Sequence, residues 1–186
     1  MDKMFLLTII ALVGVAILTS GCIKPQDGSD TMTFEKSILD DARARYPGAD
    51  IIEIEGSEEI SGIKVTNVRV TFASDTICPS RLRLRYKQPF GYETGVPIYI
   101  VKDCRVTCTE NCIITGPEEA IIAAHTLPES EQVNEFIGDG TGIKAHAKFS
   151  DDVWTVTFNR ARDGAIMEVA LTAKNPRILK AQLLEK

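Results

Sequence analysis

The apolar residues of this sequence change from a helical period to a strand period, and this change occurs twice along the chain. In the first half, apolar side chains at every fourth position predict a helix over 34–46, which Pro47 and Gly48 end. Alternating and β-branched residues then predict strands, which begin at 52 and continue at 63–72, 80–87 and 97–103. A helix followed by antiparallel strands indicates an α+β arrangement.

The second half repeats this order. Thr115 and Glu118 match a capping box, so we expect Thr115 to cap a helix that runs to about residue 127 and ends at Pro128. A polar loop should follow, before strands at 143–149, 153–158, 165–173 and 178–184. The sequence therefore predicts an α+β fold of two tandem modules, 33–113 and 114–186, each with one helix packed on a three- or four-stranded antiparallel sheet.

The N-terminal run at 4–23 carries no charged residue and contains Thr19, Ser20 and Gly21 directly before Cys22. An apolar run that ends in small residues and a cysteine resembles a lipoprotein signal peptide. This resemblance implies that 1–21 is removed, that Cys22 is acylated and that 22–32 is a linker. The alternative is an uncleaved single-span anchor, since a helix of this length covers about 30 Å. Both interpretations place the rest of the chain at the outer face of the cytoplasmic membrane.

Four further cysteines follow this run: Cys78, Cys104, Cys108 and Cys112. An even number outside the cytoplasm predicts two disulfides, for which three pairings are open. A hairpin of the strands between them places Cys78 opposite Cys104, at a separation that a disulfide can bridge. Cys108 and Cys112 would then pair across a turn. The alternative is that all four cysteines form a thiolate site for zinc or an iron–sulfur cluster.

A row of basic residues, Arg81, Arg83, Arg85 and Lys87, shares one face of an expected strand, because side chains alternate between the faces of a strand. One hypothesis is a cationic stripe of about 20 Å that contacts an anionic partner, such as lipid headgroups or an acidic protein. We favour a solvated sheet face. Its charges would be balanced by acidic residues of the preceding segment: Glu53, Glu55, Glu58 and Glu59.

The C-terminal half resembles a PepSY domain over 115–183. The resemblance rests on a helix that opens Pro117-Glu-Glu-Ala, a strand that contains Trp154-Thr-Val, and a last hairpin that ends at Ile178-Leu179. It implies a PepSY-like or cystatin-like module without catalytic residues of its own. The PepSY family is associated with peptidase inhibition and regulation outside the cell, so a peptidase is one expected partner.

The remaining features favour binding over catalysis. The net charge of −5 argues against a nucleic-acid partner, which requires a basic surface. The two histidines, His125 and His146, have no acidic residue at a spacing typical of a metal site. We therefore expect a non-enzymatic lipoprotein without a cofactor, which binds the membrane through its N-terminus and a protein or other component of the cell envelope. The alternative is a four-cysteine metal or redox protein of the envelope.

Overall fold

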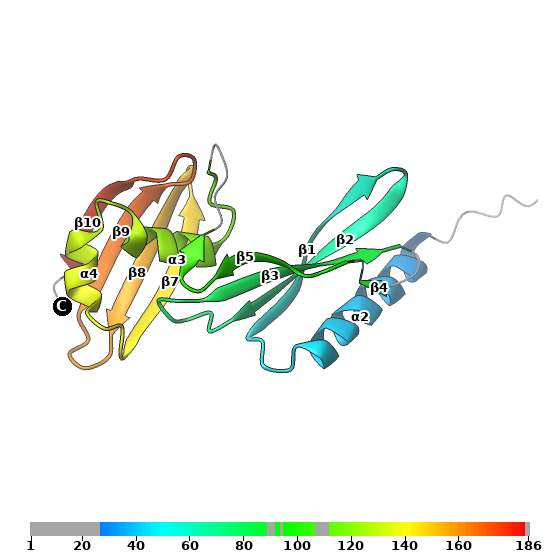
Figure 1. Ribbon diagram of the computed structural model, residues 1–186, viewed down its shortest axis with the longest axis horizontal. Helices are drawn as coiled ribbons and strands as arrows, with labels where there is room; N and C mark the ends of the chain where they lie inside the picture. The colour runs from blue at the N-terminus through cyan, green and yellow to red at the C-terminus, as the bar shows by residue number, and fades with distance from the viewer. Residues whose placement is uncertain (1–26, 89–91, 94, 107–111, 185–186) are drawn as a thin grey trace, which may run out of the picture. The chain divides into compact units, whose positions relative to one another are not determined.

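The computed structural model of the chain describes residues 27–88, 92–93, 95–106 and 112–184 (Figure 1). These residues form an α+β fold with two antiparallel sheets and three helices, α2 (Asp27–Arg45), α3 (Pro117–Thr126) and α4 (Glu131–Ile137). The predicted fold class is confirmed at this level. Both sheets belong to one compact unit, Phe34–Lys186, which is separate from the unit Met1–Thr33.

The first sheet has the strand order β1-β2-β3-β5-β6, and β4 pairs with the end of β3. Its strands are β1 (Ile51–Ile60), β2 (Ile63–Phe72), β3 (Ser80–Lys87), β4 (Tyr92–Glu93), β5 (Ile98–Lys102) and β6 (Arg105–Val106). The sequence predicted three or four strands, and the sheet has six. The difference comes from β4 and β6, which are two residues long and too short for an alternating pattern to reveal.

Helix α2 covers one face of this sheet. Ile38 and Ala42, from the predicted apolar stripe, are fully buried against alternate residues of β2 and β3: Val68, Val70, Leu82, Leu84 and Tyr86. The ring of Tyr46 meets the edge of Phe72, with centroids 6.2 Å apart. The phenol of Tyr86 donates a hydrogen bond of 2.8 Å to Asp41, and burial together with this carboxylate raises the pKa of Tyr86.

The second sheet has the order β10-β9-β8-β7 (Figure 1). Its strands are β7 (Ile143–Ser150), β8 (Val153–Arg160), β9 (Ile166–Thr172) and β10 (Ile178–Leu184), close to the predicted ranges. Helices α3 and α4 pack on the same face, because their apolar side chains join one core with Val156, Phe158 and Val169 of the sheet. The opposite face of this sheet carries the alternate, more polar residues.

Helix α4 occupies the segment in which the sequence predicted only a polar loop. Its three buried residues, Val133, Phe136 and Ile137, have the spacing of one helical face. They are separated by polar residues in a stretch of seven, which is too short to show a helical period reliably. The prediction of a single helix in the second module is therefore wrong.

Helix α3 does not begin with the predicted capping box. Its N-cap is Gly116, Pro117 occupies the first helical position, and no side chain caps the helix. Thr115 lies one residue before the cap, so its hydroxyl cannot serve the first turn in the predicted way. This displacement places the carboxylates of Glu118 and Glu119 in the first turn, where both are buried.

Candidate functional site

The face of the first sheet opposite α2 carries the basic row predicted from the sequence. Strand pairing sets Arg81 opposite Thr71, Arg83 opposite Arg69, and Arg85 opposite Asn67. Side chains that lie directly opposite in an antiparallel pair share a face. Arg69 and Thr71 of β2 therefore belong to the same polar surface as the predicted row.

Arg81 does not lie on an exposed surface. Its side chain is 2 % exposed, and its guanidinium pairs with Glu55 of β1 and with Glu119 of α3. The nitrogen–oxygen distance to Glu119 is 3.1 Å. Both the cationic-stripe hypothesis and the favoured solvated face are wrong for this residue, because a buried guanidinium with two carboxylate partners meets neither an external anion nor bulk water. Alternation showed which residues share a face, but it did not show that α3 covers one end of that face.

The rest of the row is balanced by acidic residues of β1. Arg83 donates to Glu55 at 2.6 Å, and Arg85 lies 3.5 Å from Glu58. Lys87, at the end of β3, is exposed. Glu53 accepts a hydrogen bond from Arg69 of β2 at 2.8 Å. Three of the four expected acidic residues, Glu53, Glu55 and Glu58, are therefore paired with arginines. The face is thus largely neutralised within the chain.

The first turn of α3 receives donors from the first sheet. One oxygen of Glu118 accepts from the Arg69 guanidinium and, at 2.7 Å, from the Thr71 hydroxyl. Glu119 accepts from Arg81 and from both the backbone N–H and the hydroxyl of Thr115, at 2.9 and 2.7 Å. We call the set of Arg69, Thr71, Arg81, Thr115, Glu118 and Glu119 the buried charge cluster. It connects β2 and β3 to the first turn of α3.

Gly116 provides the space that this cluster needs. A Cβ atom at this position would clash with the Arg81 guanidinium and would lie 3.2 Å from Glu118. The backbone at Gly116 is extended, so the requirement for glycine is steric and does not come from its φ angle. This steric requirement could not be recognised from the sequence, because Gly116 followed by Pro117 is an ordinary start of a helix.

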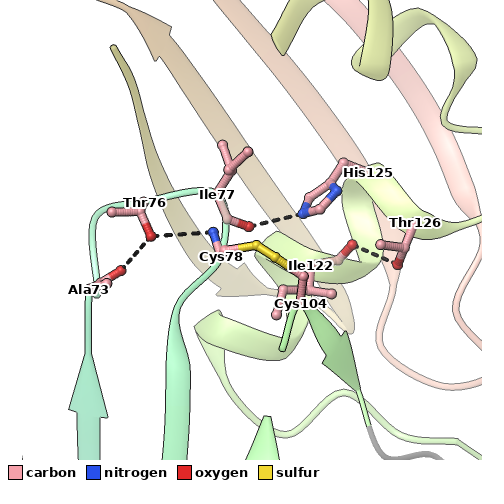
Figure 2. Close-up of a disulfide and its surroundings, with 8 residues drawn as sticks. All are labelled: Ala73, Thr76, Ile77, Cys78, Cys104, Ile122, His125 and Thr126. Atoms are coloured by element: carbon pink, nitrogen blue, oxygen red, sulfur yellow. Dashed lines mark hydrogen bonds between the residues drawn. A yellow bond between two sulfur atoms is a disulfide. The ribbon is translucent and has the colours of Figure 1, made fainter. Parts of the chain in front are cut away.

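The disulfide Cys78–Cys104 joins the segments on either side of the β3–β5 hairpin, as predicted (Figure 2). The two Cα atoms are 5.0 Å apart, and the pair of Arg81 and Val101 has the predicted register. Beyond this pair the predicted register is wrong, because an irregularity after Arg81 shifts β5 by one residue. Cys112 is also disulfide-bonded. Cys108, its predicted partner, lies outside the described residues. Cys78 and Cys104 are therefore not thiolates in this structure, which conflicts with the four-thiolate alternative.

His125 of α3 lies next to this disulfide (Figure 2). Its Nε2 is 2.9 Å from the carbonyl oxygen of Ile77, and burial lowers the pKa of the ring below the usual histidine value. The imidazole is therefore neutral near pH 7 and donates its Nε2–H to Ile77. His125 therefore connects α3 to the segment that precedes Cys78.

The β2–β3 loop, residues 73–79, contacts the second sheet through Asp75 and the second core through Ile77. The Asp75 carbonyl oxygen accepts from the Ala145 N–H of β7 at 2.8 Å, and its carboxylate accepts from Lys144 at 2.7 Å. The Lys144 ammonium lowers the pKa of the Asp75 carboxyl. Ile77 packs on the second core and fills the space beside Gly140, where a Cβ atom would clash with it.

Two cavities border polar groups but show no catalytic arrangement among the residues described. One, of about 480 Å³, is lined by Arg105, Ile114, Leu127 and the disulfide-bonded Cys104 and Cys112. The other, of about 400 Å³, lies on the polar face of the second sheet and is lined by residues that include His146, Lys148, Thr157 and Glu168. No group of three or more His, Cys, Asp or Glu side chains in the described ranges could hold a metal ion.

Strand β5 and the two residues before it, Val96 and Pro97, present apolar side chains at an incompletely paired edge. Val96, Ile98 and Tyr99 are 86 %, 43 % and 49 % exposed. The short strand β6 pairs only with Val101 and Lys102, so no described strand pairs with the outer edge of β5 before Val101. We call this segment, 96–100, the β5 edge.

Comparison of the chain with protein-family models, with curated proteins and with solved structures gives no match. Cys22, the predicted lipidation site, lies outside the described residues. From Asp27 onward, the described helices include none that is both long enough and apolar enough to cross a membrane.

Sequence reasoning missed Arg69, Thr71, Asp75 and Ile77. Arg69 and Thr71 could have been found, since both lie on the odd-numbered face of 63–72, as Arg81 does on its own strand. Asp75 and Ile77 lie in a loop, where no period indicates which residues will contact the second sheet.

Proposed function

We propose that this chain is a non-enzymatic binding protein, anchored by its N-terminus at the outer face of the cytoplasmic membrane. The Cys78–Cys104 disulfide supports a location outside the cytoplasm, because thiols are kept reduced in most cytosols. We assign a structural role to the charged residues of the buried charge cluster, since their guanidiniums and carboxylates pair with one another inside the unit.

The observation that carries the binding function is the β5 edge. An exposed strand edge offers unpaired backbone N–H and C=O groups, and an extended peptide can add to it as a further strand. At this edge the exposed side chains of Val96, Ile98 and Tyr99 supply apolar contacts on both sides of the backbone.

The partner that fits this edge is an extended, apolar segment of another protein of the cell envelope. The resemblance of 115–183 to PepSY domains adds a peptidase as one class of partner, with regulation of that peptidase as the outcome of binding. The β5 edge lies outside the region of that resemblance, so it can bind a partner whether or not the partner is a peptidase.

Site-specific photo-crosslinking in intact cells tests the proposal. A photoreactive amino acid at Val96 should give one discrete adduct, and mass spectrometry should map the adduct to an extended segment of one envelope protein. The Ile98→Glu substitution should reduce this adduct at least tenfold. A photoreactive residue at Met32, which is 76 % exposed, is the matched control and should not give the adduct. Equal adducts from Val96 and Met32 would reject the β5 edge as the binding surface.

Mass spectrometry of the mature N-terminus tests the anchor separately. An acylated Cys22 would support lipidation. An intact Met1 on a membrane-bound chain would support the single-span anchor, and a soluble chain without either would reject membrane anchoring.

A further inference from the structure

The β5–β6 hairpin places two cations directly opposite one another. Strand pairing sets Lys102 of β5 opposite Arg105 of β6, and only Asp103 and Cys104 lie between them in the turn. Side chains directly opposite on antiparallel strands share a face, with Cβ atoms about 4.5–5.5 Å apart. Two like charges in this position repel each other and disfavour the pairing of the strands, unless an anion binds both. We call Lys102 and Arg105 the cation pair.

The chain supplies no acidic partner to the cation pair. Among residues 27–88, 92–93, 95–106 and 112–184, no ion pair includes Lys102, Arg105 or Asp103. Arg105 also borders the cavity of about 480 Å³, and the described lining of that cavity contains no acidic residue. Both members of the pair are exposed. Unlike the arginines of β3, which pair with glutamates of β1, these two cations are open to an anion from outside the chain.

An irregularity in β5 brings the cation pair to the face of Tyr99. The pairing of β3 with β5 skips Ile100, which is therefore an extra residue of β5. In a regular strand, residues 99 and 102 would point to opposite faces, because their separation is odd. The extra residue puts them on the same face, and the Lys102 ammonium lies over the Tyr99 ring, 5.0 Å from its centroid. Arg105 shares this face because it lies opposite Lys102.

The tip of this hairpin is held in place within the chain. Asp103 and Cys104 both have a φ angle of 54°, and positive φ at both positions is what a two-residue type I′ turn requires. The disulfide to Cys78 fastens Cys104 to the segment that precedes β3 (Figure 2). A pair of cations on a fixed backbone loses less conformational freedom when it binds an anion, and this favours binding.

We propose that Lys102 and Arg105 bind a carboxylate of the extended segment that adds to the β5 edge. This inference rests on the binding function proposed above and adds the charge of the partner. The edge offers apolar contacts at Val96, Ile98 and Tyr99, and the cation pair lies where this edge ends and β6 begins to pair with β5. The partner segment is therefore apolar along its length and acidic at one end.

The period of a strand determines where the acidic residue stands in the partner segment. A partner residue opposite Tyr99 shares the face of the Tyr99 ring, and so does the residue two positions further along. Two positions span about 7 Å along a strand, and the Lys102 ammonium is close to the same ring. The partner thus carries Asp or Glu two positions from an apolar residue, on the side nearer to Lys102. A basic residue at this position is repelled by both cations.

Selection from a displayed library of random peptides tests this assignment. The full chain, solubilised in detergent and immobilised, should enrich peptides with alternating apolar residues and with Asp or Glu two positions from one of them. A variant with Lys102→Glu and Arg105→Glu should enrich Lys or Arg at that position instead. The matched control, Lys148→Glu with Lys180→Glu, makes the same change of charge at exposed residues of the second sheet and should retain the acidic preference.

Three outcomes of this selection would overturn the proposal. The first is a wild type that enriches no peptides, and the second is enrichment without an acidic preference. The third is the same acidic preference in the variant with Lys102→Glu and Arg105→Glu. Circular dichroism verifies that each variant is folded.

A synthetic peptide from the selection gives a second measurement. Replacement of its Asp or Glu by the corresponding amide should weaken binding about fivefold at low salt, the upper range for an exposed ion pair. This difference should decrease at high salt, because exposed charges are screened. Equal affinities of the acid and the amide at low salt would contradict a carboxylate site.

A single substitution separates binding from a structural role of the cation pair. Arg105→Gln should weaken the acidic peptide but leave the urea midpoint equal to that of the wild type or above it, because it relieves the repulsion from Lys102. A lower midpoint would show that Arg105 stabilises the fold and would count against a residue kept for an external anion.

The Val96 adduct in cells distinguishes a failure of this inference from a failure of the proposed function. If Ile98→Glu removes the adduct and the variant with Lys102→Glu and Arg105→Glu retains it in full, the β5 edge binds its partner without the cation pair. A wild type that gives no Val96 adduct would reject the binding function, and this inference with it.

Discussion

Arg81 of β3 and Glu119 of α3 form a buried ion pair, with 3.1 Å between Arg81 Nη1 and Glu119 Oε2. Both side chains are at least nine-tenths buried, and each has further partners in the buried charge cluster. The pair connects a strand of the first sheet to the helix that opens the second half of the chain.

Arg81→Ala should lower the free energy of unfolding by about 3–5 kcal/mol, because it leaves Glu55 and Glu119 without their cation in a water-poor environment. The matched control is Arg83→Ala, which removes another partner of Glu55 from a site that is 31 % exposed. That variant should lose no more than about 1 kcal/mol. Urea denaturation measures both values, and equal losses would contradict a buried cluster that holds the unit together.

Gly116→Ala should destabilise the protein by about 1–3 kcal/mol, the usual cost of extra volume in a packed site, because the new methyl group collides with the Arg81 guanidinium. Gly48→Ala is the control, since a Cβ atom there would meet nothing within 4 Å. Thermal melting of the two variants checks the difference. If Gly116→Ala had the same melting temperature as the wild type, the Arg81 guanidinium would have to move away from the new methyl group without loss of stability.

Loss of the Cys78–Cys104 disulfide should lower the free energy of unfolding by about 3 kcal/mol, since the bond closes a loop across a separation of 26 residues in the unfolded chain. The Cys78→Ser and Cys104→Ser double variant in urea denaturation measures this loss. Thiol counting under denaturing, non-reducing conditions provides the control. Cys78 and Cys104 should be unreactive in the wild type, and their alkylation without prior reduction would reject the disulfide.

Stability should fall on the acid side of neutrality because of His125. Burial depresses the pKa of this ring in the folded state, so the unfolded state binds the proton more readily. His125 contributes fully to the free energy of unfolding above its unfolded pKa of about 6.5. This contribution decreases as the pH falls toward the lower pKa of the ring in the folded state. His125→Gln should reduce this decrease, whereas His146→Gln, which leaves the contact with Ile77 in place, should retain it. Urea midpoints between pH 7.5 and 5 measure the slopes. The same slope in His125→Gln as in the wild type would exclude this residue as the cause.

The Cys78–Cys104 disulfide was predictable from the sequence, and the full strand register and the charge cluster were not. The spacing of the two cysteines around two alternating strands indicated the disulfide, because a strand has a strict period of two. It did not reveal the irregularity after Arg81, which shifts the following pairs of β3 and β5 by one residue. The same alternation placed Arg81 beside Arg83 on one face. Whether another element covers that face is a tertiary property, and Arg81 is buried only because α3 lies over its end of the strand.

Short elements were the other limit. The three apolar residues of α4, Val133, Phe136 and Ile137, occupy a single helical face, but seven residues give too few turns to distinguish a helix from a loop. Thr115 and Glu118 matched a capping box, yet the glutamates of this turn accept hydrogen bonds from outside the helix. The residues of the expected capping box instead form hydrogen bonds with arginines that are 34–49 residues away in sequence.

The β2–β3 loop also has a consequence for how this chain can be divided by proteolysis or by recombination of its gene. The segment 114–186 carries its own strands and helices, but it does not encode the loop that closes β7 or the arginines that neutralise Glu118 and Glu119. A fragment cut at residue 113 would carry an open strand edge on both sides of its sheet and two glutamates without cations. The two halves are therefore expected to be inherited and degraded as one piece.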